Sequence, residues 1–172
     1  MAKKDEANRD KFLIESSAQT VKAIDEIRKL SKGLVSSDLK GEFISDAIDR
    51  LAKETSNSQQ IKISFKTMEI VKTDMTSKLS LNIFRIVQEQ LNNIIKHSKA
   101  TAVNIILLQT RDTLMLSVKD NGIGFDISKK HGGIGINNII SRAKIFKGAA
   151  NFISEPGKGC TLIVSFPISK AI

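Results

Sequence analysis

The apolar positions of the chain follow a helical period in its first third and a strand period in much of the remainder. Between residues 18 and 34, apolar side chains recur every three or four positions, which predicts an amphipathic helix with a face made of Val21, Ile24, Ile27, Leu30 and Leu34. A second helix is expected over 39–54, and its apolar face would consist of Leu39, Phe43, Ile44, Ala47, Ile48 and Leu51. The polar run "TSNSQQ" at 55–60 then predicts a linker.

Beyond this linker, strand and helix patterns alternate. Residues 61–65 place apolar side chains at every second position, which predicts a strand with one buried face. The elements expected after it are a long helix over 79–97, strands near 102–109 and 113–119, a helix near 138–146, and strands near 150–154 and 161–166. This order predicts an α+β fold, a two-layer sandwich with helices on one face of a mixed sheet. We expect two parts, a helical one over 1–56 and the α+β domain over 57–172.

The positive charge of the chain lies in its α+β part. Residues 1–58 carry 11 basic and 11 acidic side chains, whereas residues 59–172 carry 16 basic and 7 acidic ones, which accounts for the whole net charge of +9. This imbalance predicts an anionic partner for the second part. Nucleic acid is disfavoured, because the chain has no Trp or Tyr on which bases could stack and its basic residues are spread along the sequence. A phosphorylated small molecule satisfies the same charge.

The composition also narrows the compartment and the classes of bound group. No segment approaches the roughly 18 apolar residues of a membrane helix, and the charged start lacks the apolar core of a secretory signal. A single cysteine, Cys160, excludes an internal disulfide and fits a reducing compartment. With one Cys and two His, a protein-ligated zinc site is not expected. We therefore expect a cytoplasmic domain, and the sequence leaves open whether a longer protein is anchored in a membrane.

Two glycine-rich segments lie close together in the second part. The first, "DNGIGF" at 120–125, on its own is typical of a hairpin turn. The second, "GGIGINN" at 132–138, leads into a predicted helix. Glycine lets the main chain approach a ligand closely, and successive amides ahead of a helix N-terminus attract anions. The segments therefore predict a phosphate cradle, although the sequence contains neither a Walker A loop nor a convincing dinucleotide-binding fingerprint.

The long helix expected over 79–97 carries many polar groups in the stretch "QEQLNNIIKH". Glu89 and Asn93 lie four residues apart and share one face of a helix, as do Asn92 and Lys96. A carboxylate, an amide oxygen and an ammonium near a phosphate cradle suit a Mg²⁺-nucleotide, because Mg²⁺ takes hard oxygen ligands. Glu89 could also polarise an attacking group. Taken alone, the same residues fit the solvated face of a surface helix.

Three segments, in this order, closely resemble the ATPase domain of histidine kinases. "RIVQEQLNNIIKHSKA" resembles its N box, "VKDNGIGFD" its G1 box, and the region from "HGGIGINN" to "CTLIVSFP" its G2 box with the closing strands. The resemblance covers about residues 60–168. It implies the Bergerat-type ATP-binding fold, which histidine kinases share with gyrase B and mismatch-repair ATPases. The N-box pattern resembles the nitrate-sensor type subfamily, and "AIDEIRKLSKGLVSSDLK" more weakly resembles the end of that subfamily's dimerisation and phosphotransfer domain.

The resemblance implies a role for each residue that matches the family's boxes. Asn93 would coordinate Mg²⁺, and Glu89 would be the catalytic acid of the N box, near the γ-phosphate and the attacking group. The implied nucleotide contacts are phosphate contacts by Lys96 with help from Asn92, adenine recognition by Asp120 and Thr161, close access at Gly122 and Gly124, and backbone amides from Gly133 and Gly135. Cys160 stands where the family often has Thr or Ser. The implied cofactors are ATP and Mg²⁺.

No histidine of the chain has the context of a phospho-acceptor. The family's acceptor lies on the first dimerisation helix and is usually followed by an acidic residue, whereas Ser98 follows His97 and Gly132 follows His131. We therefore expect 1–56 to be the C-terminal part of the dimerisation domain, without its acceptor, and 57–172 to be the ATP-binding catalytic domain. The resemblance implies a homodimeric sensor histidine kinase. It would transfer the γ-phosphoryl group of Mg-ATP to a histidine on a dimerisation helix, for relay to a response regulator.

Two other functions stay open from the sequence. An anti-sigma-factor serine kinase of the same superfamily would use the same boxes, but it would not explain the segment "IDEIRKLSKGL". A non-catalytic module, whose ATP site only organises partner contacts, would keep Asp120 and the glycines. Such a module would be expected to lose Glu89 or Asn93, and this chain retains both.

Overall fold

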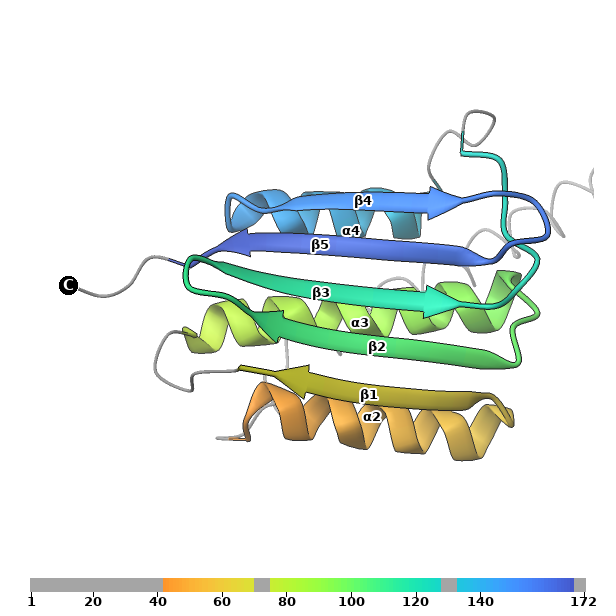
Figure 1. Cartoon of the computed structure of the whole chain (residues 1–172), viewed down its shortest axis with the longest axis horizontal. Coiled ribbons are helices and arrows are strands. Elements are labelled where there is room, and N and C mark those ends of the chain that lie inside the picture. Colours follow the sequence, from red (N-terminus) through yellow and green to blue (C-terminus); the bar gives the residue numbers. More distant parts are fainter. Residues whose placement is uncertain (1–41, 70–74, 128–132, 169–172) are drawn as a thin grey trace, which may run out of the picture. The chain divides into compact units, whose positions relative to one another are not determined.

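A single mixed sheet forms one layer of the fold, with the strands in the order β1-β2-β3-β5-β4 (Figure 1). The strands are β1 (Lys62–Met68), β2 (Ala102–Gln109), β3 (Thr113–Asp120), β4 (Ala149–Ser154) and β5 (Cys160–Pro167). β1 and β2 are parallel, and the other neighbouring strands are antiparallel. The structure, a computed structural model, describes residues 42–69, 75–127 and 133–168.

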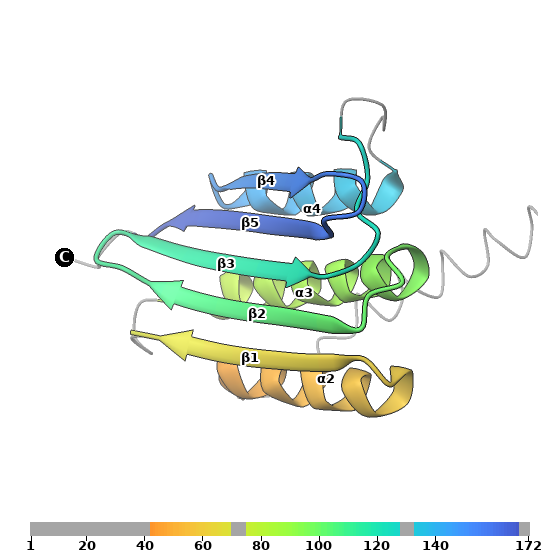
Figure 2. The same ribbon diagram turned by 45° about the vertical axis from the view of Figure 1, so that its right-hand side comes forward.

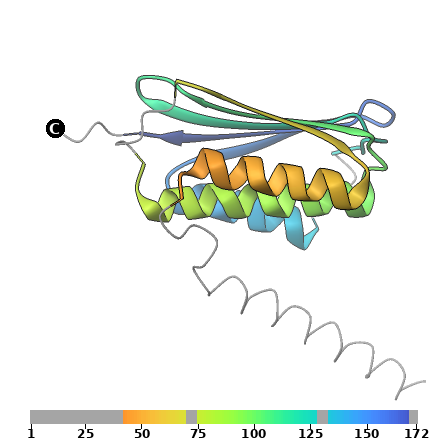
Figure 3. The same ribbon diagram turned by 90° about the horizontal axis from the view of Figure 1, so that it is seen from below.

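Within the described residues, three helices form the second layer, and all of them cover the same face of the sheet (Figures 1, 2 and 3). They are α2 (Ile44–Gln59), α3 (Ser77–His97) and α4 (Ile134–Ile145). α3 connects the parallel strands β1 and β2, which need such a crossover because a tight turn cannot join parallel strands. The predicted α+β sandwich with helices on one face of a mixed sheet is confirmed. Among the described residues, no helix combines the length and the apolarity needed to cross a membrane.

The core lies between the central strands and the helices. Side chains alternate along β2, β3 and β5, so that every second one is buried beneath the helices. The strand residues with no exposed surface are Ile105, Leu107, Leu114, Leu116, Val118, Leu162, Val164 and Phe166. Those of the helices are Ala47, Ile48, Ile83, Ile86, Val87, Ile139 and Ala143. The apolar periodicity of the sequence therefore reflects the interface between the sheet and the helices. Packing at this interface positions α3 and α4.

The first described helix differs from the sequence prediction. α2 runs over Ile44–Gln59 rather than 39–54, so the stretch expected as a polar linker forms its last turns. The helix ends where Gln60 takes a left-handed conformation, with φ of 55°. Because α2 packs on β1 and α3, it belongs to the same layer as the other helices, and the expected division at 56/57 falls inside it. The helix predicted between residues 18 and 34 lies outside the described residues.

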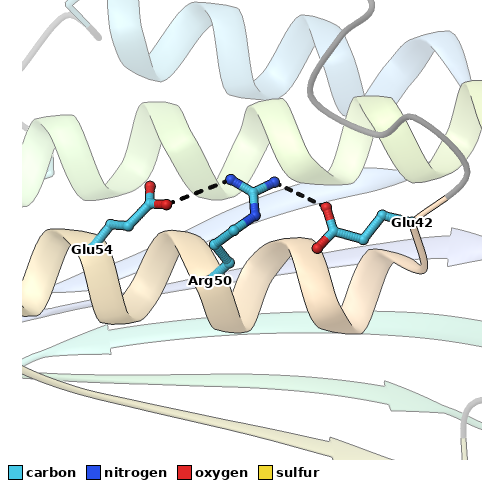
Figure 4. Close-up of polar contacts among 3 residues, drawn as sticks. All are labelled: Glu42, Arg50 and Glu54. Carbon is cyan, nitrogen blue, oxygen red and sulfur yellow. Dashed lines mark hydrogen bonds and ion pairs between the residues drawn. The ribbon is translucent and has the colours of Figure 1, made fainter.

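The outer surface of α2 carries an ion-pair cluster around Arg50 (Figure 4). One guanidinium nitrogen of Arg50 lies 2.9 Å from Glu42 Oε2, and the other lies 3.7 Å from Glu54 Oε1. These side chains are substantially exposed, so that each pair contributes at most about 1 kcal/mol. The buried face of α2, rather than this cluster, therefore holds the helix on the sheet.

A buried hydrogen bond joins α3 to the C-terminal part of α4. The Asn82 side chain on α3 is 6 % exposed, and its Nδ2 donates to the main-chain oxygen of Arg142 at 2.8 Å. This carbonyl lies in the last turn of α4, where carbonyl groups lack a partner within the helix. The bond therefore satisfies a helix end and fixes the position of α4 along α3.

We expect Asn82→Ala to lower the free energy of unfolding by about 1–2 kcal/mol, because the partly buried carbonyl of Arg142 at the helix end loses its donor. Urea unfolding followed by circular dichroism measures this loss. Asn104→Ala on the exposed face of β2 is the control and should change stability by less than about 0.5 kcal/mol. Equal losses in the two variants would show that the bond between the helices contributes nothing.

Candidate functional site

The side chains of Glu89 and Asn93 on α3 lie directly against the first turn of α4. A Cβ atom placed on Gly135 would lie 2.7 Å from Glu89 Oε1 and 2.7 Å from Asn93 Oδ1. Both distances are shorter than any ordinary carbon contact, so a side chain at this position would have to displace the two polar groups. The fold thus brings the N-box residues and one glycine of the predicted phosphate cradle together.

Asp120 ends β3 at the same end of the fold and is only 2 % exposed. Its Oδ1 accepts a hydrogen bond from the Gly122 amide at 2.8 Å. Burial raises the pKa of the Asp120 carboxyl above its ordinary value, and hydrogen bonds from the backbone amides of Gly122 and Cys160 partly oppose this shift. A buried carboxylate with remaining acceptor capacity is suited to an amino group that enters the site.

The loop after Asp120 is held by close backbone contacts rather than by side-chain packing. A Cβ atom on Gly122 would lie 2.3 Å from the main-chain oxygen of Ser98, at the C-terminal end of α3. Gly124 has φ of +59°, and a Cβ atom there would lie 2.1 Å from the main-chain oxygen of Glu155. Asn121 fixes the loop from a third side, because its Oδ1 accepts from the amides of Thr101 and Ala102. Glycine is therefore required at both positions for the loop to sit between α3 and the β4–β5 turn.

The Asn93 amide suits a nucleotide-borne Mg²⁺. Among the described residues, Asn93 Nδ2 is one of two buried side-chain polar atoms without a hydrogen-bond partner. The oxygen and nitrogen of an amide exchange by rotation of the group, so this side chain can present an oxygen ligand and still donate to a phosphate. In the described part of the chain, no three His, Cys, Asp or Glu residues are placed to hold a metal by themselves. The residues thus fit an ion carried mainly by phosphate oxygens and water.

The other predicted site residues differ in how they lie relative to this group. Asn92 and Lys96 are exposed on α3, and Gly133 is the exposed N-cap of α4, with open space around its Cα. Thr161 pairs with Lys119 on the face of the sheet that the helices do not cover, so the structure does not bring its side chain to Asp120. The residue opposite Asp120 is Cys160.

The neighbouring residue Cys160, to which the sequence analysis gave no contact, lies on the opposite face of the sheet from Thr161. It is 6 % exposed and shares the helix-covered face of the sheet with Asp120. The strand register identifies this residue. Because Asp120 pairs with Cys160, the side chain of Cys160 lies on the same face of the sheet as that of Asp120, and the side chain of the next residue lies on the other face. His97 is exposed in the last turn of α3, whereas His131 lies outside the described residues.

Two arginines lie near Glu89. Burial lowers the pKa of the Arg142 guanidinium, the neighbouring Arg85 guanidinium lowers it further, and the Glu89 carboxylate opposes both effects. Arg85 donates from Nη1 to Gln88 Oε1 at 2.7 Å on its own helix. The end of the site beyond Glu89 is therefore cationic.

A separate hollow of about 270 Å³ lies between α4 and β4. It is lined by Phe125, Ile127, Ile136, Asn137, Ile140, Ala150, Asn151 and Phe152. None of the predicted catalytic or nucleotide-binding residues lines it. The hollow therefore lies apart from the group around Asp120, Glu89 and Asn93.

The chain matches the family model of the histidine kinase-, DNA gyrase B- and HSP90-like ATPases over residues 78–170, which is more than half of its length. The chain belongs to this family. The matched span contains the N-box helix, the Asp120 loop and α4, so the polar groups brought together by the fold are those of a family ATPase domain.

Two similar proteins are named as histidine kinases. The chain is 35% identical over 147 residues to the sensor histidine kinase LiaS of Bacillus subtilis, which covers 85% of this chain and 40% of that protein. It is 36% identical over 92 residues to the histidine-protein kinase/phosphatase DegS of Brevibacillus brevis, covering 53% of this chain and 24% of that protein. The chain thus spans less than half of the length of these curated relatives.

A solved structure confirms the fold of this ATPase domain. The ATP-binding domain of PrrB from Mycobacterium tuberculosis superposes with a TM-score of 0.61 at 21% identity, covering 74% of this chain and 96% of that one. The predicted histidine-kinase-like ATP-binding domain is confirmed at the level of the family and the fold.

We expect Gly135→Ala to weaken binding of Mg-ATP by about 10-fold, because the new methyl group displaces Glu89 and Asn93. Stability should stay unchanged or rise by up to about 1 kcal/mol, because alanine is the better helix residue. Calorimetric titration and thermal unfolding measure the two effects. Ser141→Ala, on the exposed face of the same helix, is the control. If both variants bind ATP equally well, the contact at Gly135 does not shape the site.

We expect Asp120→Asn to be more stable than the natural chain near neutral pH, because the raised pKa means that burial disfavours the charged carboxyl. The stability that protonated Asp120 contributes is complete below its ordinary value of 3.8 and is lost as the pH rises through the raised pKa. The difference between the two proteins should therefore shrink on acidification, as measured by urea unfolding. A difference that does not change with pH would refute this account.

Proposed function

We propose that this chain is the catalytic ATPase domain of a sensor histidine kinase that transfers the γ-phosphoryl group of Mg-ATP to a histidine. The contact of Glu89 and Asn93 with Gly135 carries this proposal, because it joins a carboxylate, an amide and a helix N-terminus at one point. The proposed phosphate acceptor lies on a dimerisation helix that this chain does not contain, and the phosphate would pass from there to a response regulator.

Adenine recognition is assigned to Asp120 and its loop. The carboxyl group would accept a hydrogen bond from the adenine amino group. It can do so because the bond from the Gly122 amide uses only part of the acceptor capacity of the carboxyl oxygens. Gly122 and Gly124 keep the loop close to α3 and the β4–β5 turn, which leaves room for the base and sugar. Cys160 forms the neighbouring wall of the adenine pocket, in the place that the resemblance suggested for Thr161.

The phosphates are assigned to the opposite end of the site. The first turn of α4, with Gly133 as N-cap and Gly135 within it, presents free amides and the positive end of the helix dipole. Lys96 would reach the phosphate oxygens from α3, with Asn92 at the rim. Asn93 would hold Mg²⁺, which neutralises phosphate charge when it is bound.

Glu89 is the proposed catalytic residue. An imidazole nitrogen of the acceptor forms a bond to the γ-phosphorus while the bond to the ADP oxygen breaks. Glu89 would accept the proton that the imidazole loses, or hold the ring in line through its hydrogen bond. Most of the rate would come from positioning and charge neutralisation, as in other phosphoryl transfers.

The finer assignments rest on the sequence. The N-box pattern supports the nitrate-sensor type subfamily, and the segment before residue 42 supports part of a dimerisation domain, hence a homodimer in a longer protein. A cytoplasmic location fits both assignments. The serine-kinase alternative gains no support from the site, since the acceptor lies outside it. The non-catalytic alternative is disfavoured, because Glu89 and Asn93 are both present and lie together.

In the presence of Mg-ATP, we expect the chain alone to take up essentially no acid-labile phosphate. It should phosphorylate a dimerisation fragment that carries the acceptor helix, supplied in trans. Glu89→Gln should slow this transfer by about 100-fold while ATP affinity changes little, because the loss falls on the chemical step. Labelled ATP and acid lability of the product measure the transfer.

Lys158→Gln, at an exposed residue of the β4–β5 turn, serves as the control for a lost surface charge. Phosphorylation of the chain itself at His97 or His131 would refute the proposed route. So would a wild-type chain that binds Mg-ATP but phosphorylates no histidine.

A further inference from the structure

Ser154, the last residue of β4, lies in one row with Cys160 and Asp120. Ser154 pairs with Cys160 on β5, and Cys160 pairs with Asp120 on β3. Residues that pair directly across neighbouring strands point to the same face of the sheet, so the Ser154 side chain shares the helix-covered face with that of Asp120. Two strand spacings separate Ser154 from Asp120, about 10 Å, which is too far for both side chains to bind one ligand group.

The Ser154 hydroxyl joins two segments of the chain. It donates a hydrogen bond to the main-chain oxygen of Gly159 at 2.8 Å, and it accepts one from the Phe125 amide at 2.9 Å. A serine hydroxyl has one donor, and here both its donor and its acceptor role are used. Ser154 therefore bridges the β4–β5 turn, residues 155–159, and the loop that follows Asp120.

This loop runs beside the β4–β5 turn (Figures 1 and 2). The Gly157 amide donates to the main-chain oxygen of Ile123 at 2.7 Å. A Cβ atom on Gly124 would lie 2.1 Å from a main-chain oxygen of the turn. These contacts are made by the main chain, whereas Ser154 adds a side-chain bond that a substitution can remove.

One peptide group links Ser154 to Asp120. The Gly159 carbonyl, which accepts from Ser154, and the Cys160 amide belong to the same peptide group. This amide donates to the Asp120 carboxyl group. A peptide group whose oxygen accepts a hydrogen bond becomes a better donor, because successive hydrogen bonds polarise one another. The hydrogen bonds thus form a chain from the Phe125 amide through Ser154 to Asp120.

We propose that Ser154 is a positioning residue for adenine recognition, because its hydroxyl ties the loop after Asp120 to the peptide group that binds the Asp120 carboxyl. This inference rests on the proposed function, in which Asp120 accepts a hydrogen bond from the adenine amino group. Ser154 would act through the loop and the peptide group, and it would not touch the nucleotide. Without its hydroxyl, the loop loses a bond to the turn and the carboxyl group is held less firmly.

Binding calorimetry on the full 172-residue chain tests this role with two nucleotides. Mg-ITP serves as the comparison, because its base carries an oxygen in place of the adenine amino group and cannot donate to Asp120. Ser154→Ala should raise the Kd for Mg-ATP by about 10-fold, the equivalent of one hydrogen bond, and the Kd for Mg-ITP by less than about threefold.

Two further variants complete the test. Ser154→Thr keeps the hydroxyl and should bind Mg-ATP within about twofold of the wild-type chain. Ser117→Ala, on the face of β3 that the helices do not cover, is the matched control and should change neither Kd. With the acceptor fragment in trans, Ser154→Ala should raise KM for ATP and change kcat by less than about twofold, because the phosphate end of the site is untouched.

Equal losses of affinity for Mg-ATP and Mg-ITP in Ser154→Ala would overturn the inference, because Ser154 would then act on the whole site. Unchanged Mg-ATP affinity would overturn it as well. If Ser154→Thr binds Mg-ATP as weakly as Ser154→Ala, the hydroxyl is not the cause and the inference fails. A wild-type chain that binds neither nucleotide, or does not distinguish them, would instead overturn the proposed function or its assignment of adenine to Asp120.

Discussion

The close approach of the first turn of α4 to the middle of α3 is the constraint on which the site depends. It requires a residue without a side chain at position 135, since a methyl group there would occupy the space of Glu89 and Asn93. The Asn82 bond fixes the other end of the same pair of helices. Beneath both contacts, Ile139 and Ala143 are fully buried against the core, so α4 cannot move along α3 without disturbing the packing.

The two ends of the site are built by different means. The Asp120 end is made of main-chain contacts, in which a strand end and a glycine loop are held by the α3 terminus and by the β4–β5 turn. The Glu89 end is made of side chains of α3 that lie against the main chain of the first turn of α4. Both ends of the site lower the stability of the folded protein. At one end the carboxyl group of Asp120 is buried, and at the other the amide nitrogen of Asn93 is buried without a hydrogen-bond partner. Such local costs are expected where a protein must bind a polar ligand.

The sequence predicted the parts of this fold that depend on local periodicity. α3, β2 and β3 were expected within two residues of their observed ends, because long apolar stripes identify them. The end of α2 was missed because an exposed helical turn and a linker have the same polar composition. The i,i+4 spacing of Glu89 and Asn93 indicated a shared face, but their contact with Gly135 depends on how two helices pack, which spacing alone does not specify. The choice between Cys160 and Thr161 depended on strand register, where a shift of one residue reverses the face.

The single cysteine of the chain lies opposite Asp120, and this placement gives the protein an intrinsic chemical reporter. Because Cys160 is only 6 % exposed, a thiol reagent should reach it slowly while the Asp120 end of the site is closed. The rate of alkylation therefore measures how often this end opens. Since no second thiol contributes to the signal, the measurement needs neither an added label nor a cysteine-free background.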